Sequence, residues 1–121
     1  MKKKIIVVDD KLTIGKIIAA YLSSDFNFEY FDNPIPCIER LENGPLPDLI
    51  ISDILMPNMR GDKFLAYVKE DERLKDIPVV MLSSEDSSSE RVRLLQNGAE
   101  DYIVKPFNPL ELKIRINKIL K

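Results

Sequence analysis

Polar side chains follow four of the short apolar runs in this chain, and their types could bind a metal ion and a phosphoryl group. Asp9 and Asp10 follow the first run, and Asp53 closes the third. Ser83 follows the fourth run, and Lys105 follows the fifth. Carboxylates crowded together repel one another, so a lysine and a divalent cation would be needed to balance their charge. Because the ligands are all oxygen atoms, the expected ion is hard, such as Mg²⁺, which often completes its shell with water and phosphate.

Each of these residues also has a simpler interpretation when it is taken alone. An aspartate at the end of a strand is often a helix cap or a turn residue. A lysine before a proline, as in Lys105-Pro106, is often only a surface residue. The simpler interpretation weakens for the set, because four strand ends would each have to present a group that phosphoryl chemistry uses. We therefore predict a single site at one edge of a sheet.

The apolar runs themselves are predicted strands. Three of them are continuously apolar and rich in β-branched residues, which is typical of strands covered on both faces of a parallel sheet. The predicted strands are residues 5–8, 28–31, 49–51, 79–82 and 102–104.

The stretches between the strands carry helix signals. Apolar residues recur at helical spacing in the first three of these stretches. They are Ile14, Ile17, Ile18, Tyr21 and Leu22, then Ile38 and Leu41, then Phe64, Leu65 and Val68. The fourth helix is predicted to begin with the capping box at residues 87–90 and to stop near Asn97-Gly98. The fifth begins at Asn108-Pro109, and its later Ile119-Leu120 favours a helix over the strand-like alternation of residues 110–116.

Alternation of strands and helices with short connections predicts one α/β domain over residues 1–121. Right-handed crossovers would give a doubly wound parallel sheet with helices on both faces. In such sheets, functional groups collect beyond the carboxyl ends of the strands. These ends are where the acidic, hydroxyl and lysine side chains fall.

Composition excludes several classes of function. The chain has 121 residues, with 45% hydrophobic and 31% charged, which is typical of one globular domain. It has no histidine, which excludes histidine-based catalysis and histidine-ligated zinc, and its single cysteine, Cys37, is expected to be a buried apolar residue. A net charge of −2 gives no general attraction to nucleic acid. No apolar run could span a bilayer, so we expect a cytoplasmic protein without a membrane association.

Four blocks of the sequence, taken in order, resemble the receiver domains of two-component response regulators. The blocks are residues 5–10, 53–61, 78–83 and 98–107, and the resemblance extends over the whole chain. It implies a five-stranded flavodoxin-like sheet with the strand order 2-1-3-4-5. It also implies a signalling switch controlled by phosphorylation, and not an enzyme with turnover.

The resemblance implies a role for each residue of the predicted site. Asp53 would be the phosphoacceptor, taking a phosphoryl group from a sensor histidine kinase or a phosphotransfer protein. Asp10 and Asp53 would bind Mg²⁺ directly, Asp9 would act through bound water, and Leu55 would supply its backbone carbonyl. Lys11 departs from the family pattern, because an acidic or polar residue is usual there, and we expect its side chain to point to solvent.

The resemblance also implies a switch and a partner surface. Lys105 would pair with one phosphoryl oxygen and Ser83 would hydrogen-bond another, and movement of this hydroxyl would let the ring of Tyr102 turn inward. Leu110 and Ile114 fall opposite the predicted buried side of the fifth helix. We interpret them as part of a face with the fourth helix and fifth strand, used for homodimerisation or for docking an output domain. Two scattered exposed apolar residues are the plainer interpretation.

Other functions use similar residues. A phosphatase of the haloacid-dehalogenase type also uses a strand-end aspartate and Mg²⁺, but it needs a second aspartate where this chain has Leu55. A flavodoxin would need a Ser/Thr/Gly-rich loop after the first strand, where Asp9-Asp10-Lys11 stands. A degenerate receiver that works without phosphate would not need the complete set of acidic, hydroxyl and lysine residues.

Overall fold

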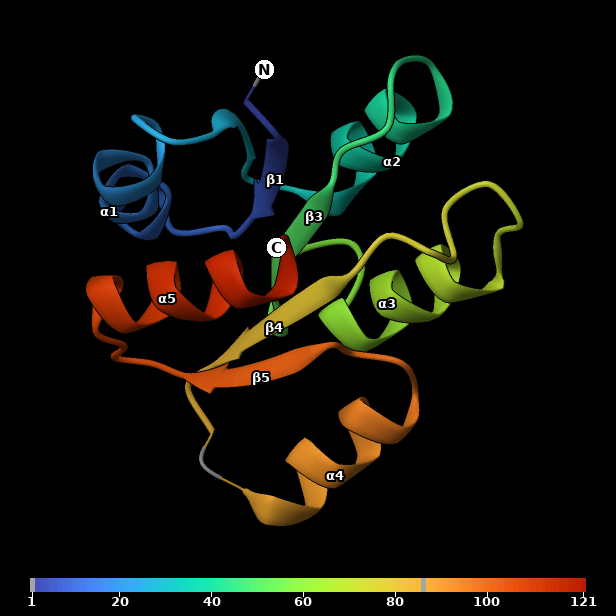
Figure 1. Ribbon diagram of the computed structural model, residues 1–121. Coiled ribbons are helices and arrows are strands. Elements are labelled where there is room, and N and C mark those ends of the chain that lie inside the picture. The colour runs from blue at the N-terminus through green and yellow to red at the C-terminus, as the bar shows by residue number, and fades with distance from the viewer. Residues whose placement is uncertain (1, 86) are drawn as a thin grey trace.

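Strands and helices alternate strictly along the chain, giving five strand–helix units. The computed structural model describes residues 2–85 and 87–121. The elements, shown in Figure 1, are β1 (Lys4–Val8), α1 (Leu12–Leu22), β2 (Asn27–Phe31), α2 (Pro34–Glu42), β3 (Leu49–Asp53), α3 (Gly61–Glu70), β4 (Val79–Ser83), α4 (Ser88–Gln96), β5 (Asp101–Val104) and α5 (Pro109–Ile119).

The strands form one parallel sheet in the order β2-β1-β3-β4-β5. Both the parallel arrangement and the strand order were expected, and both are confirmed. Every residue of β3 and of β4 is buried, as their continuous apolar sequences predicted for strands inside the sheet.

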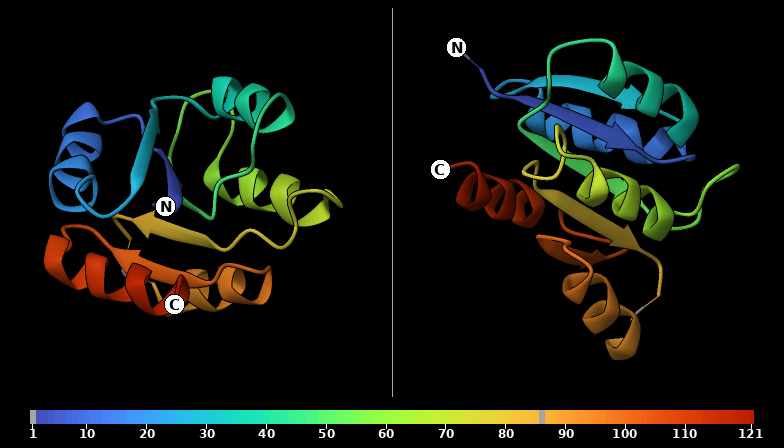
Figure 2. Two further views of the ribbon diagram at one scale, coloured as in Figure 1. Left: turned by 45° about the horizontal axis from the view of Figure 1, so that its top comes forward. Right: turned by 90° about the vertical axis from the view of Figure 1, so that its right-hand side faces the viewer.

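Helices cover both faces of the sheet, as Figure 2 shows from two sides. Apolar side chains of α1 and α5, such as Ile18 and Leu112, pack on one face with Ile51 and Val80. Side chains of α2, α3 and α4 pack on the other face, where Phe64 is completely buried. Successive residues of a strand point to opposite faces, so the buried strands contribute to both cores.

The predicted helix starts are confirmed by their caps. Ser87 Oγ accepts a hydrogen bond from the amide of Glu90 at 3.3 Å at the start of α4. Asn108 Oδ1 accepts from the amide of Leu110 at 2.9 Å at the start of α5, and Gly98 follows α4 with φ of 108°.

The described part of the chain contains no helix with the length and hydropathy to cross a bilayer.

The apolar stripe predicted for α1 is partly wrong. Ile17 and Tyr21 are each 41% exposed, whereas Gly15, Ile18 and Leu22 are buried. A Cβ atom at Gly15 would lie 2.6 Å from the ring of Tyr30 in β2. The ring occupies the space beside this glycine, so the buried side of α1 contains Gly15 together with Ile18 and Leu22, whereas Ile17 and Tyr21 lie on the more exposed side.

Candidate functional site

The strand register brings the predicted polar residues to the same edge of the sheet. Asp53 and Ser83 are the last residues of β3 and β4, and Asp9 directly follows β1. Asp53 is paired with Leu82, and Ser83 is paired with Val104, the residue before Lys105. The carboxyl ends of neighbouring strands are therefore level, and their side chains project into a common space.

Lys105 links two buried carboxylates in this space. Its Nζ atom lies 2.8 Å from Asp9 Oδ2 and 3.1 Å from Asp53 Oδ1. Asp9 and Asp53 are both almost completely shielded from solvent, at 0% and 4% exposure. A lysine between two buried carboxylates neutralises only part of their charge, so the site keeps a net negative charge.

Asp10 adds a third carboxylate to the cluster. Asp9, Asp10 and Asp53 each offer one oxygen atom, and these oxygens all lie within 4.8 Å of one another. Asp10 is exposed, so the cluster is open to solvent on its side. Several oxygen donors with an open side are the donor set that a hard divalent cation requires.

Burial is the main influence on the ionisation of Asp53. Removal from solvent raises the pKa of the Asp53 carboxyl, and the neighbouring charge of Asp9 raises it further. The ion pair with Lys105 and the hydrogen bond from the Ile54 amide lower it, but the net direction is upward. Burial pulls the pKa of Lys105 down, yet the hydrogen bond to Asp9 and the charge of Asp53 outweigh this and raise it, so the ammonium stays charged.

The backbone around Asp53 is held on several sides. Ile54 donates its amide to Asp53 Oδ1 at 2.9 Å, and Ser52 Oγ donates to the carbonyl oxygen of Asp53 at 2.9 Å. The amide of Gly61 donates to the carbonyl of Ile54 at 2.7 Å, which closes the loop between β3 and α3. A Cβ atom at Gly61 would lie 2.1 Å from the carbonyl oxygen of Asp53. The chain can pass so close to Asp53 only because residue 61 has no side chain.

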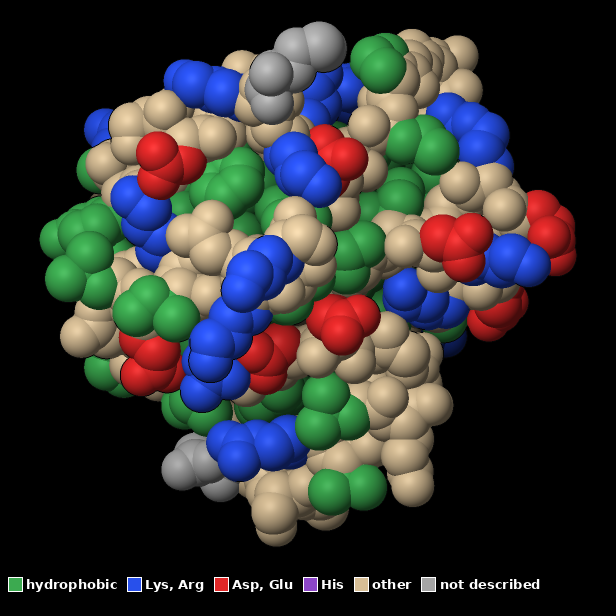
Figure 3. All heavy atoms as spheres, in the orientation of Figure 1, with side chains coloured by type: hydrophobic (Ala, Val, Ile, Leu, Met, Phe, Trp, Pro, Cys, Tyr) green, Lys and Arg blue, Asp and Glu red, His purple; other side chains and the backbone are tan. Residues whose placement is uncertain are grey.

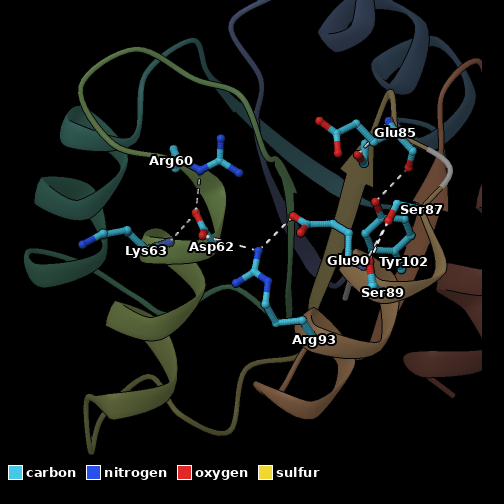
Figure 4. Close-up of polar contacts among 10 residues, drawn as sticks. Arg60, Asp62, Lys63, Glu85, Ser87, Ser89, Glu90, Arg93 and Tyr102 are labelled. Atoms are coloured by element: carbon cyan, nitrogen blue, oxygen red, sulfur yellow. Dashed lines mark hydrogen bonds and ion pairs between the residues drawn. The ribbon is translucent and has the colours of Figure 1, made fainter.

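Ser83 and Tyr102 share contacts with the backbone of Glu85. Ser83 Oγ accepts a hydrogen bond from the Glu85 amide at 3.0 Å. Figure 4 shows the second contact, in which the hydroxyl of Tyr102 donates to the Glu85 carbonyl at 2.9 Å. Tyr102 is buried, with the guanidinium of Arg91 5.5 Å from the centre of its ring. A hydroxyl that accepts one hydrogen bond can still donate another, so Ser83 keeps a hydrogen atom for a ligand.

A pocket of about 340 Å³ lies beside the acidic cluster, lined in part by Asp53, Lys105 and Ser84. Lys11 also lines it, with its Nζ atom 4.0 Å from Asp10 Oδ1, and its side chain is mostly exposed, as expected. The side chain of Leu55 lines the pocket and is exposed too. Ser83 itself is buried and does not line the pocket.

Several supporting contacts come from backbone groups that sequence reasoning missed. The amide of Lys11 donates to Asp9 Oδ1 at 2.9 Å, and the hydroxyl of Tyr30 donates to the carbonyl of Asp9 at 2.5 Å. The peptide groups of Glu85 hold two predicted switch residues in the same manner. A backbone amide or carbonyl is present in residues of every type, so the sequence carries no signal for these contacts.

Comparison with known proteins agrees with this geometry. The family model of the response regulator receiver domain matches residues 5–117. This chain belongs to the response regulator receiver family. It is 35% identical to the phosphate regulon transcriptional regulatory protein PhoB of Escherichia coli, in an alignment that covers 100% of the chain and 53% of PhoB. It is also 37% identical to the two-component response regulator ORR5 of Oryza sativa, covering 97% of the chain and 88% of that protein. The chain thus spans about half the length of PhoB and most of ORR5.

Solved receiver structures share the fold over nearly the whole chain. The chemotaxis response regulator CheY4 of Vibrio cholerae superposes with a TM-score of 0.90 at 28% identity, covering 99% of this chain and 100% of that one. The receiver domain of the Francisella response regulator 1452 gives a TM-score of 0.89 at 28% identity, covering 98% and 97% of the two chains. The domain is a receiver of two-component signal transduction, and neither a haloacid-dehalogenase phosphatase nor a degenerate receiver is favoured.

Proposed function

We propose that this receiver accepts a phosphoryl group on Asp53 with the help of Mg²⁺. The observation that carries the proposal is the position of Lys105, whose ammonium contacts both Asp9 and Asp53 beside a pocket. A positive group fixed next to a buried carboxylate can hold the phosphoryl oxygens while that carboxylate attacks. Asp10, on the open side of the cluster, completes the acidic set.

The proposed reaction is an in-line transfer. A carboxylate oxygen of Asp53 forms a bond to phosphorus, and the bond from phosphorus to a histidine nitrogen of a sensor kinase or phosphotransfer protein breaks. The electron pair of the broken bond stays with the imidazole nitrogen, and Asp53 becomes an acyl phosphate. Lys105 would pair with one phosphoryl oxygen, and the free hydrogen of Ser83 would reach another. Catalysis in such transfers is mainly positioning and charge neutralisation.

The acidic cluster fits the metal that this reaction requires. Asp10 and Asp53 would hold Mg²⁺ directly, Asp9 would act through bound water, and the backbone carbonyl of Leu55 would add a further oxygen. Bound Mg²⁺ would neutralise the charge that accumulates on the transferred group. Asp9 already accepts hydrogen bonds from the Lys11 amide and from Lys105, which fixes its carboxylate for an indirect role.

The proposed output depends on Ser83 and Tyr102. A phosphoryl group on Asp53 would attract the Ser83 hydroxyl toward itself. This hydroxyl now accepts a hydrogen bond from the Glu85 amide. The hydroxyl of Tyr102 is hydrogen-bonded to the carbonyl of the same residue, so a shift of Ser83 would be transmitted through Glu85 to the tyrosine ring. This is a local charge event that biases a nearby two-state side chain. The activity is thus that of a switch and not of an enzyme with turnover.

We further propose that the switched face, formed by α4, β5 and α5, binds a partner. Leu110 and Ile114 are 58% and 57% exposed on α5, and a pocket of about 450 Å³ lies between α4 and α5. Lys and Arg side chains gather over α5 with acidic side chains beside them (Figure 3), and Arg115 contacts Asp101 at 2.9 Å. Exposed apolar groups bordered by charges are typical of a protein interface, here for a second copy or an output domain.

Replacing Leu110 and Ile114 with glutamate should weaken association of the phosphorylated domain. The change places two charges in the apolar part of the face and replaces no buried residue. Sedimentation velocity before and after phosphorylation measures the result, and unfolding in urea verifies that the fold is kept. Unchanged association by a folded double variant would refute the role of these residues.

The proposed function predicts that the domain takes up one phosphoryl group from a small acyl phosphate. Intact-mass spectrometry after incubation with acetyl phosphate and Mg²⁺ should show one added phosphoryl group. EDTA should abolish the addition, because the carboxylates then repel the anionic donor. Sodium chloride at the same ionic strength, without EDTA, should leave the addition in place. Uptake that persists at the same rate in EDTA would contradict the metal requirement.

A further inference from the structure

Helix α4 is the most weakly packed helix of the fold. Of its nine residues, Leu94 alone is buried. By contrast, α3 buries Gly61, Phe64, Leu65 and Val68 among ten residues. Figure 1 shows α4 lying beyond the edge strand β5, at the margin of the molecule. A helix with so little buried apolar surface is expected to be low in local stability, because packing supplies most of the stability of helices in proteins.

A chain of ion pairs joins this helix to the start of α3, as Figure 4 shows. Arg93 of α4 lies 3.5 Å from Asp62 Oδ2 and 2.9 Å from Glu90 Oε1. Asp62 Oδ1 in turn accepts a hydrogen bond from Arg60 Nε at 3.2 Å. The contact between Asp62 and Arg93 is the step that crosses from one helix to the other, whereas the other two contacts are local.

Asp62 is a firm attachment point. It follows Gly61, whose backbone packs directly against that of Asp53 and donates to the carbonyl of Ile54. Its carboxylate also accepts from the amide of Lys63 at 3.1 Å in the first turn of α3. A negative charge in the first turn of a helix is itself favourable. The aspartate is thus fixed by α3, and Arg93 extends from α4 to reach it.

We propose that the ion pair between Asp62 and Arg93 is a latch that holds α4 against α3. With one buried side chain, α4 depends on this contact more than the other helices depend on their surface ion pairs. Breaking the latch should let α4 open locally more often while the rest of the domain stays closed. Because α4 forms part of the proposed partner face, the latch would also set how that face is presented. The latch itself does not depend on phosphorylation of Asp53.

The caps of α4 allow the latch to be tested without unfolding the helix. Ser87 caps its start, and the amide of Ala99 donates to the carbonyl of Leu94 at its end. Arg93→Gln exchanges residues of similar helix propensity, and Asp62→Asn keeps an acceptor oxygen for the Lys63 amide. Arg93→Gln also removes the contact with Glu90, but Asp62→Asn does not. A result common to both variants therefore reports on the contact that joins the two helices.

Hydrogen–deuterium exchange of the unphosphorylated domain, followed by mass spectrometry, measures the local opening of α4. Amides of α4 should exchange about two- to fivefold faster in Asp62→Asn and in Arg93→Gln, the range expected for a partly exposed ion pair. The double variant should exchange no faster than the faster single variant, because both changes break the same contact. Arg115→Gln, which removes the contacts with Asp101 and Glu111, should leave exchange in α4 unchanged.

Two results would overturn the latch. One is an exchange rate of the α4 amides that equals the wild-type rate in either single variant, since each variant removes a partner of the same ion pair. The other is equal acceleration throughout the domain, which would indicate general destabilisation. Because no phosphodonor is added, neither result bears on whether Asp53 accepts a phosphoryl group.

Discussion

Replacing Asp53 with asparagine should abolish uptake of a phosphoryl group from acetyl phosphate. An amide oxygen is a far weaker nucleophile than a carboxylate, and the side chain would also lose one charge of the acidic cluster. Intact-mass spectrometry should show unmodified protein under conditions that modify the wild type. Asp32→Asn is a matched control, because Asp32 is an exposed aspartate that follows the edge strand β2. That control should be modified normally, whereas a phosphorylated Asp53→Asn variant would place the acceptor elsewhere.

The same substitution should stabilise the domain at neutral pH when no divalent cation is present. Burial and the charge of Asp9 raise the pKa of Asp53 in the folded state, so the folded domain holds this proton more tightly than the unfolded chain does. The cost of ionised Asp53 is therefore full above the raised folded pKa, declines as the pH falls below that value, and is gone below the unfolded pKa. Asparagine carries no charge at any pH, and its side-chain oxygen can still accept from the Ile54 amide.

Urea unfolding at several pH values measures this effect. In EDTA at neutral pH, the free energy of unfolding of Asp53→Asn should exceed that of the wild type by about 1 kcal/mol. The difference should shrink in acid, where Asp53 of the wild type is protonated. A variant less stable than the wild type at neutral pH would mean that the ion pair with Lys105 outweighs burial and repulsion.

The sheet and the position of the site could be predicted because both depend on the order of residues along the chain. Continuous apolar runs of β-branched residues predicted buried parallel strands, and β3 and β4 are completely buried. Parallel strands in level register place their carboxyl ends together, so aspartates and a lysine at those ends had to meet. The contacts of Lys105 with Asp9 and Asp53 follow from that topology.

The exposure of Ile17 and Tyr21 on α1 could not be predicted, because the buried side of this helix includes a glycine. Ile17 and Tyr21 fit a helical stripe by spacing alone, yet both are 41% exposed. The Tyr30 ring lies over Gly15, and this contact between a glycine and a distant aromatic ring rotates the buried side of the helix. Hydrophobic periodicity is read from large apolar side chains. It therefore does not detect a glycine, which can be buried here because it has no side chain.

Contacts through the backbone escaped prediction for a related reason. The Glu85 peptide groups hold Ser83 and Tyr102, and the contact does not depend on the side chain of residue 85.

The latch between Asp62 and Arg93 joins residues 31 positions apart on two helices whose relative placement no local pattern fixes. Gly61 also escaped prediction, because its role is a close approach to the backbone of Asp53, which no local sequence pattern indicates.

Gly61→Ala should therefore destabilise the domain strongly and disturb the site. The new Cβ atom would lie 2.1 Å from the carbonyl oxygen of Asp53 and 2.8 Å from the Cα of Ile54. Both neighbours are backbone atoms, so relief requires a shift of the segment that carries Asp53 or of the start of α3. We expect a loss of about 3 kcal/mol in the free energy of unfolding. The melting temperature should fall by roughly 10 °C or more, and phosphoryl uptake at a temperature where the variant is folded should be slower than in the wild type.

Gly44→Ala provides the matched control, since it makes the same substitution where the neighbour can move. Its Cβ atom would lie 3.0 Å from Nη1 of Arg40, the end of a flexible side chain, and no closer than 3.7 Å to the carbonyl oxygen of Arg40. This change should cost less than about 1 kcal/mol and leave phosphoryl uptake unaltered. If Gly61→Ala were as stable as Gly44→Ala, the close approach to Asp53 would not be what requires glycine at residue 61. The difference between the two variants thus isolates the packing of the α3 start against Asp53 from the general effect of replacing glycine with alanine.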